Sequence, residues 1–164
     1  MANSVWVRLS QMRDASELID LDHVVWQGEN TPSVIHWKNR EEYLQKCPPG
    51  SQLVAGIGDR ICGYLGFDNP TPLETNRHVY EINIAVHPDC KRQGIGRKLM
   101  EAVKELATDR GVRKLSLRVL SSNPDAYSFY RSCGFIEQGR LVEEFYLNGQ
   151  YIDDILMWCP VEQT

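Results

Sequence analysis

One segment in the middle of the chain constrains the fold most, because it alternates a strand, a helix and a second strand. Residues 78–86 read His-Val-Tyr-Glu-Ile-Asn-Ile-Ala-Val, which predicts a strand rich in β-branched side chains. Apolar residues then recur on one helical face over 97–110, and Gly111 ends that helix. Residues 114–120 predict the next strand. Strands joined by a crossover helix pair in parallel, so this segment predicts an α/β sheet.

The rest of the chain adds strands and helices on both sides of this unit. Strands are predicted at 5–10, 52–57, 61–67, 135–147 and 150–158, helices at 14–28, 34–46 and 124–134, and a loop at 70–77. Asn148-Gly149 between the last two strands is a strong hairpin signal. The resulting order, β-α-α-β-β-β-α-β-α-β-β, predicts a mixed six- to seven-stranded sheet.

Composition fits one domain and excludes several classes of protein. A length of 164 residues with 42% hydrophobic residues predicts one core in a single domain, 1–164. A net charge of −4 excludes a general basic surface for nucleic acid. No apolar run approaches the ~18 residues of a membrane span, and residues 1–6 lack a signal-peptide layout. We therefore expect a cytoplasmic protein that binds neither nucleic acid nor a membrane.

Cysteine and histidine spacing argues against a metal site. The five cysteines are scattered, without a Cys-x-x-Cys pair, which fits a reducing compartment rather than a disulfide framework or zinc. The four histidines show no ligand spacing either, and we expect structural roles for them. Cys133 lies where a predicted helix ends and is interpreted as a small core residue rather than a nucleophile.

The segment between the strand 78–86 and the following helix is suited to an anion. Residues 91–98 read Lys-Arg-Gln-Gly-Ile-Gly-Arg-Lys, so cations and two glycines stand directly before a helix. A helix start exposes unpaired N–H groups and the positive end of the macrodipole, and glycines let the backbone approach a ligand. A pyrophosphate would also be attracted by Arg92, Arg97 and Lys98. The alternative is a solvated basic turn in which the glycines serve only the bend.

Two other phosphate-binding patterns fail on spacing. A Walker loop requires Gly-x-x-x-x-Gly-Lys-Ser/Thr, which this chain lacks. The dinucleotide pattern Gly-x-Gly-x-x-Gly would need a third glycine at position 99, where Leu99 stands.

Three motifs in the right order resemble the GNAT superfamily of N-acetyltransferases. They are Ile-Ala-Val-His-Pro at 84–88, the loop at 91–96, and Asn123-x-x-Ala-x-x-Phe-Tyr-x-x-x-Gly-Phe, which ends at Phe135. Lys91 departs from the Gln or Arg that opens the family's loop pattern, but it keeps a long polar side chain. The resemblance covers residues 78–135 motif by motif, and the order of strands and helices extends it to the whole chain.

This resemblance implies a fold and a co-substrate. The GNAT fold is a mixed, splayed sheet with helices on both faces, in which the strands 78–86 and 114–120 would part to admit the pantetheine arm of acetyl-CoA. Acetyl would then pass to a primary amine by direct attack in a ternary complex. No metal is implied.

The resemblance also assigns residues to the cofactor. Contacts with acetyl-CoA are implied at Ile84, Ala85, Val86, Arg92, Gln93, Gly94, Ile95, Gly96, Arg97, Lys98, Asn123 and Tyr130. Asn123 before a proline is also a good N-cap, which alone would explain it. Tyr130 would also serve as one more core aromatic.

Two residues are implied for catalysis. Tyr130 would protonate the departing thiolate, and Glu81 would accept the proton of the amine, usually through water. A solvated strand glutamate is the alternative for Glu81. The ribosomal-protein branch of the family carries its glutamate five residues before the asparagine, where this chain has Arg118, which argues against that mechanism.

The acceptor is less constrained. The tail at 148–157 looks like both phosphinothricin-type and ribosomal-protein-type branches, and we expect a small amine or amino acid. Alternatives are protein N-terminal acetylation, with a peptide amine as partner, and a non-catalytic acyl-CoA-binding module. Trp26, Trp37 and Tyr43 are expected to pack near the acceptor site, and a homodimer is possible, as in many relatives.

Overall fold

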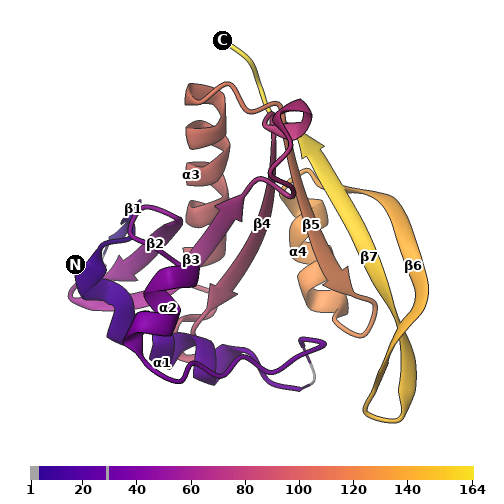
Figure 1. The fold of residues 1–164 in the computed structure, drawn as a ribbon, viewed down its shortest axis with the longest axis horizontal. Helices are drawn as coiled ribbons and strands as arrows, with labels where there is room; N and C mark the ends of the chain where they lie inside the picture. The colour runs from indigo at the N-terminus through magenta and orange to yellow at the C-terminus, as the bar shows by residue number, and fades with distance from the viewer. Residues whose placement is uncertain (1–3, 29) are drawn as a thin grey trace.

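The computed structural model describes residues 4–28 and 30–164, which form one seven-stranded sheet flanked by helices (Figure 1). Residues 1–3, part of the stretch compared with a signal peptide, lie outside the described residues. The strands are β1 (Val5–Leu9), β2 (Gln52–Ile57), β3 (Arg60–Asp68), β4 (Val79–Val86), β5 (Lys114–Leu120), β6 (Ile136–Leu147) and β7 (Gln150–Pro160). The α-helices are α1 (Ala15–Val25), α2 (Arg40–Lys46), α3 (Ile95–Asp109) and α4 (Pro124–Ser132). Short 3-10 turns are η1 (Met12–Asp14), η2 (Glu74–Asn76) and η3 (Pro88–Cys90). The predicted order of strands and helices is confirmed.

The sheet has the order β1-β2-β3-β4-β5-β7-β6, and its neighbours are antiparallel except for β4 and β5. That parallel pair is the one joined by the crossover helix α3, as predicted. The hairpin of β6 and β7 turns at Asn148 and Gly149, both with positive φ. A two-residue turn with this backbone matches the twist of the strands it joins.

The parallel pair gives the sheet its splayed form. β4 and β5 pair at only three positions, and the last joins Glu81 to Ser116. Beyond it, β4 remains paired with β3 while β5 remains paired with β7, so the two halves of the sheet separate (Figure 1). The opening implied by the family resemblance is therefore present.

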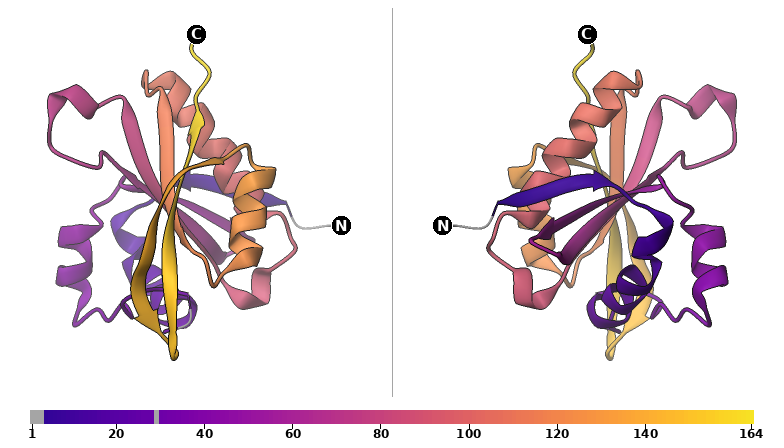
Figure 2. Two further views of the ribbon diagram at one scale, coloured as in Figure 1. Left: turned by 90° about the vertical axis from the view of Figure 1, so that its right-hand side faces the viewer. Right: turned by 90° about the vertical axis from the view of Figure 1, so that its left-hand side faces the viewer.

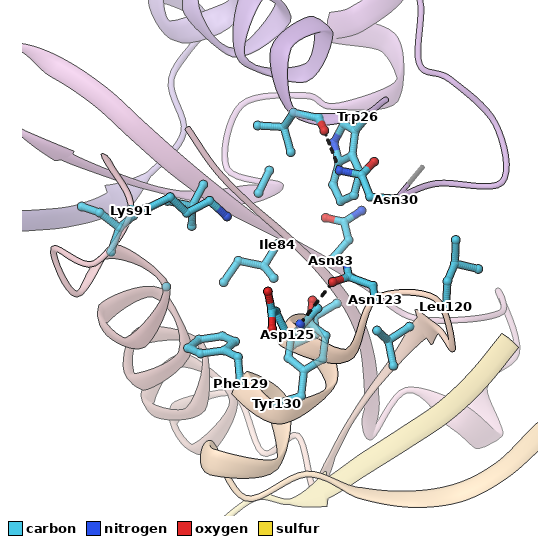
Figure 3. A pocket seen from close by; sticks show the side chains of 18 of the residues that line it. Trp26, Asn30, Asn83, Ile84, Lys91, Leu120, Asn123, Asp125, Phe129 and Tyr130 are labelled. Carbon is cyan, nitrogen blue, oxygen red and sulfur yellow. Dashed lines mark hydrogen bonds between the residues drawn. The ribbon is translucent and has the colours of Figure 1, made fainter. Parts of the chain in front are cut away.

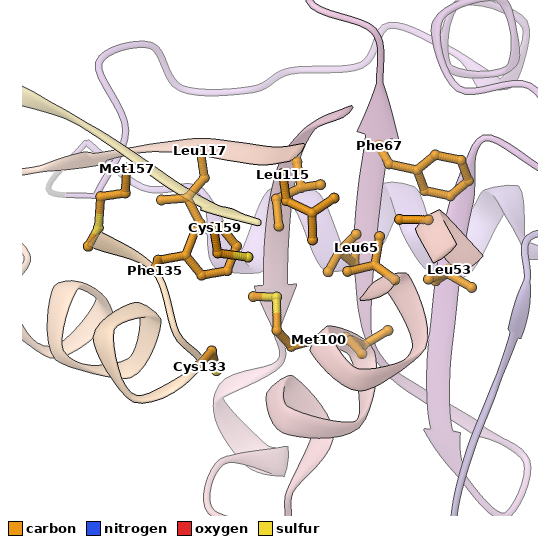
Figure 4. Close-up of a cluster of buried hydrophobic side chains, with 14 of the residues drawn as sticks. Leu53, Leu65, Phe67, Met100, Leu115, Leu117, Cys133, Phe135, Met157 and Cys159 are labelled. Carbon is orange, nitrogen blue, oxygen red and sulfur yellow. The ribbon is translucent and has the colours of Figure 1, made fainter. Parts of the chain in front are cut away.

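Helices cover both faces of the sheet, as expected (Figure 2). α3 and α4 pack on one face, over a cluster that includes Leu65, Met100, Leu115, Phe135 and Met157 (Figure 4). α1 and α2 pack on the other face, over a smaller cluster built around Leu18, Tyr43 and Tyr64. No helix of the described residues is both long enough and apolar enough to cross a membrane.

The helix predicted at 34–46 is wrong in its first half. The structure has only α2, which begins at Arg40 after the N-cap Asn39. The Asn39 side chain accepts the backbone N–H of Glu42 at 2.9 Å, and the Glu42 carboxylate in turn accepts the backbone N–H of Lys38 at 2.8 Å. Such reciprocal bonds fix a helix start. The Asn-x-x-Glu spacing of Asn39 and Glu42 is the sequence feature that indicates this helix start.

Two further helix boundaries differ. The helix predicted at 14–28 is preceded by η1 and ends at Val25, because Trp26 takes an extended backbone. The helix predicted at 97–110 begins earlier, at Ile95, with Gly94 as its N-cap. Gly96 therefore lies inside the first turn of α3 and not in the loop before it.

A partly buried ion pair joins the start of α1 to β1. Both Arg8 guanidinium Nη atoms donate to the Asp14 carboxylate, at 2.7 and 2.9 Å, and the Gln11 backbone N–H adds a third bond at 2.8 Å. Asp14 is 4% exposed. The bonds from Arg8 hold the pKa of Asp14 below its ordinary value, although burial opposes this.

We expect Asp14→Asn to lower the free energy of unfolding at neutral pH by about 1–3 kcal/mol, the usual range for a charged hydrogen bond. Because the folded-state pKa is lowered, this stabilisation is present above the unfolded-state pKa and is lost as pH falls through the folded-state pKa. Denaturant titrations of wild type and variant across acidic pH should therefore converge. Asp20→Asn, an exposed change on the same helix, is the control. Equal losses in both variants would contradict this role.

Candidate active site

A cavity of about 810 Å³ occupies the opening between β4 and β5 (Figure 3). Phe129 and Tyr130 of α4 form one wall, and Trp26 and Asn30, which follow α1, form another. Ile84 lies between these walls. The cavity thus joins segments that are far apart in the sequence.

One end of the cavity has the features that suit an anion. Gly94 has φ 81° and Arg92 has φ 64°, so the loop takes a left-handed backbone twice before α3. The first intrahelical bond runs from the Lys98 N–H to the Gly94 carbonyl at 3.0 Å. The preceding N–H groups of the first turn have no carbonyl acceptor within the helix and carry the positive end of its dipole. Lys91, Arg92 and Arg97 line this end.

The predicted loop residues divide into two groups. Arg92, Gly94, Ile95, Gly96 and Arg97 line the cavity. Gln93 and Lys98 do not, and the Lys98 Nζ lies 4.0 Å from a Glu101 carboxylate oxygen. Two of the expected contacts are therefore not among the lining residues.

The two glycines have different surroundings. A Cβ on Gly94 would meet no atom within 4 Å, but the left-handed φ there disfavours any side chain. A Cβ on Gly96 would lie 3.0 Å from the Phe129 ring. Gly96 therefore also permits close packing between α3 and α4, a role that the sequence analysis did not assign to it.

The edge of β4 that faces β5 is available to a ligand. Residues 84–86 line the cavity and pair on their other side with β3. Because β4 and β5 no longer pair there, the backbone groups that point into the opening have no strand partner. An extended chain with amide groups can bond to such an edge.

Asn123 and Tyr130 lie together at the cavity (Figure 3). The Asn123 side chain accepts the Ala126 N–H at 3.3 Å, so it is the predicted N-cap of α4 as well as a lining residue. The Tyr130 ring packs beside Phe129 and Phe135, and no hydrogen bond joins its hydroxyl to another described residue. Burial raises the pKa of Tyr130 to about 12, and Cys133 adds to the shift. The phenol is therefore protonated at neutral pH.

Glu81 lies at the point where the strands part. Its carboxylate is 3.5 Å from Nε of Arg118, whose Nη1 donates to Asp154 at 3.0 Å. Arg118 and Asp154 line the cavity. Glu81 is not among the lining residues, and its link to the cavity is the contact with Arg118. This arrangement could not be predicted from the sequence, because it depends on the pairing of β5 with β7.

The Trp26 wall is held by a buried carboxylate. Asp22, 2% exposed, accepts the Tyr64 hydroxyl at 2.5 Å and the indole N–H groups of Trp26 and Trp37 at 3.1 and 2.8 Å. Burial raises the pKa of Asp22, while these bonds oppose the shift. Trp37 packs against the buried cluster on this face, as predicted. The sequence feature that indicates a role for Asp22 is its place as an acidic residue on the apolar face of α1.

Asn83 is a lining residue that the sequence analysis missed. Its side-chain oxygen accepts the Gly66 N–H at 3.1 Å, next to the opening (Figure 3). Asp125 of α4 also lines the cavity. Among the described residues, no group of three or more His, Cys, Asp or Glu side chains could hold a metal ion.

We expect Arg92→Ala and Arg97→Ala each to weaken CoA binding about tenfold, because each removes a cation from the anion-binding end. Added salt should weaken binding to wild type more than binding to either variant. Titration calorimetry at two ionic strengths measures both effects. Arg77→Ala, an exposed arginine away from the cavity, is the control. Equal salt dependence in all proteins would show that these arginines are merely solvated.

Comparison with known proteins agrees with this geometry. A model of the acetyltransferase (GNAT) family matches residues 14–135. A solved structure of smu.2055 from Streptococcus mutans superimposes with a TM-score of 0.88 at 30% identity, covering 96% of this chain and 99% of that one. A phosphinothricin acetyltransferase of Sinorhizobium meliloti in complex with AcCoA has a TM-score of 0.84 at 20% identity, covering 96% and 88%, and shares the fold.

Curated relatives differ in acceptor. A Bacillus subtilis protein named for ribosomal protein bS18-alanine N-acetyltransferase activity is 28% identical over 89% of this chain and 93% of its own length. A spermidine N(1)-acetyltransferase of Vibrio cholerae is 38% identical, but the match covers 44% of this chain and only 43% of that enzyme. An L-amino acid N-acyltransferase of Escherichia coli is 25% identical over 68% of this chain and 64% of its own length.

Proposed function

The chain belongs to the acetyltransferase (GNAT) family, and on that basis we propose that it transfers acetyl from acetyl-CoA to the primary amine of a small acceptor, an amine or an amino acid. One observation carries the proposal most directly: the protonated hydroxyl of Tyr130 stands free at a cavity bordered by the unpaired edge of β4. An acid at this place is needed where a thiolate departs.

The cavity suits acetyl-CoA along its length. The first turn of α3 with Arg92 and Arg97 suits the pyrophosphate, and residues 84–86 with Asn123 suit the amide groups of the pantetheine arm. The solved relative with AcCoA has the same fold, which supports this placement. When bound, acetyl-CoA supplies an activated acyl group and a thiol leaving group.

The side chains of this chain would then move two protons. Glu81, at the inner end of the opening, accepts the proton of the acceptor amine through water, since only a neutral amine is a nucleophile. Backbone N–H groups of β4 polarise the carbonyl that is attacked. Tyr130 donates its proton to the departing sulfur. Transfer is direct, in a ternary complex, and Cys133, which is buried, takes no part.

Protein N-terminal acetylation is the second candidate, favoured by the likeness to the Bacillus subtilis relative along nearly its whole length. Arg118 occupies the position of the glutamate of that branch, which supports a different acceptor. A non-catalytic acyl-CoA-binding module is the third candidate, and it gives no reason for a free phenol at the cavity.

A thiol-release assay with acetyl-CoA separates these candidates. The panel contains amino acids, aliphatic amines, a polyamine and a peptide with an N-terminal alanine. We expect release above the amine-free rate with one of the small acceptors. Release with the peptide alone would favour the second candidate, and binding of acetyl-CoA without release in any reaction would favour the module.

A further inference from the structure

We propose that the acceptor carries a carboxylate beside its amine, as an α-amino acid does, and that Arg118 binds this carboxylate. The inference rests on the proposed function, since it names the acceptor for that same site. It is carried by the position of Arg118, by the side chains that hold it and by the charge it presents.

The position follows from strand register. Glu81 and Ser116 form the last pair between β4 and β5, so Asn83 and Arg118, two residues further along each strand, flank the start of the opening on the same face. This is the face on which Ala85 packs with α1, opposite to α3 and α4. Arg118 therefore lies on the Trp26 side of the cavity and not at its anion-binding end.

Asp154 holds the Arg118 side chain in place, and the rest of the guanidinium is exposed. The Asp154 side chain, 5% exposed, accepts a bond from Nη1 at 3.0 Å, whereas the Arg118 side chain is 55% exposed. The second Nη atom bonds to no other described residue. A guanidinium that one buried carboxylate orients keeps donors for a second, and its planar fork suits a carboxylate particularly well.

The exposed charges match a zwitterion. Glu81 and Arg118 present a carboxylate and a guanidinium 3.5 Å apart, with 41% and 55% of their side chains exposed. An α-amino acid carries an ammonium and a carboxylate on the same carbon, so its two opposite charges are also adjacent. Its amine would then lie toward Glu81, the proposed base, and its carboxylate toward Arg118. The Glu81 carboxylate lies 3.5 Å from Nε of Arg118, farther than the 3.0 Å between Nη1 and Asp154. The acceptor carboxylate can therefore bind the edge of the guanidinium that faces Glu81.

A diamine or a peptide N-terminus satisfies only half of this arrangement. Either one offers an ammonium to Glu81 but no carboxylate to Arg118, whose exposed cation would then face a cationic ligand or an uncharged amide. The cations at the other end are Lys91 and Arg92, in the loop before α3, and Arg97, in the first turn of α3. Arg118 is the one cation that lines the Trp26 side of the cavity within the described residues.

The test compares each amino acid with the amine left when its carboxylate is removed. Methionine pairs with 3-(methylthio)propylamine, leucine with isoamylamine and phenylalanine with phenethylamine. For wild type, we expect kcat/KM for the amino acid of the preferred pair to exceed that for its amine on the order of 10- to 100-fold, the usual effect of one charged hydrogen-bonded contact. Arg118→Gln should bring this ratio close to one, and Arg118→Lys should restore part of it. KM for acetyl-CoA should not move.

Arg113→Gln is the matched control, because Arg113 is an exposed arginine just before β5 and away from the cavity, and it should leave the ratio intact. A wild-type ratio near one, or equal losses for both members of a pair in Arg118→Gln, would overturn the inference while the proposed function stands. A wild type that acetylates no amine of any class would overturn the proposed function itself.

Discussion

Tyr130→Phe is expected to lower kcat on the order of 100-fold or more while KM for acetyl-CoA barely changes. The substitution removes one oxygen and keeps the ring that packs between Phe129 and Phe135. General acids contribute about 10²–10⁴-fold, and an interaction made chiefly in the transition state affects kcat and not ground-state binding. No hydrogen bond joins the hydroxyl to another described residue, so its loss breaks no structural bond.

Tyr127→Phe on the same helix is the matched control. The Tyr127 hydroxyl donates to the Glu137 carboxylate at 2.9 Å, outside the cavity, so its loss should lower the melting temperature slightly and leave kcat unchanged. Steady-state kinetics and thermal melts of both variants decide the matter where chemistry limits turnover. A stable Tyr130→Phe enzyme with wild-type kcat would exclude Tyr130 as the acid.

Gly94→Val is expected to weaken CoA binding about 100-fold or more. With φ 81°, Gly94 is in a conformation that costs a residue with a side chain about 1–2 kcal/mol, more when it is β-branched. The loop would relax, and the N–H groups at the start of α3 would no longer converge on one anion. A Cβ at Gly94 would meet no protein atom within 4 Å, so the chain should still fold.

Gly111→Val provides the control for strain. Gly111 follows the other end of α3, with φ 71° and the same open surroundings, but it does not line the cavity. Both variants should lose similar stability, and only Gly94→Val should lose CoA affinity in calorimetry. The affinity of wild type in a folded Gly94→Val protein would contradict the phosphate-binding role. Valine at Gly96 is less informative, because it would also collide with Phe129.

The parts of the fold that the sequence predicts well are those set by local chemistry. The crossover unit around α3 has clear periodicity, and Asn148-Gly149 and Asn123-Pro124 are strong local signals for a turn and a helix start. The predicted helix 34–46 begins too early, because the bonds made by Asn39 and Glu42 stabilise a later start. Local polarity does not reveal where a cap lies.

The parts of the site that the sequence could not predict depend on tertiary register. Motifs locate the anion-binding loop, Asn123 and Tyr130, since each has its own spacing. The link from Glu81 through Arg118 to Asp154 joins three strands and exists only because β5 pairs with β7 and parts from β4. The bonds from Tyr64, Trp26 and Trp37 to Asp22 likewise join distant segments.

Direct acetyl transfer to a small amine is the central claim, and mass spectrometry with isotopically labelled acetyl-CoA tests it in one reaction. The wild-type protein is incubated with the labelled donor and a mixture of amino acids, amines and an N-terminal alanine peptide. The masses of the small molecules and of the intact protein are then measured. We predict that the label appears on the amine of a small acceptor and that the protein gains no acetyl group. Label found only on the peptide, on the protein itself, or as free acetate would contradict the account.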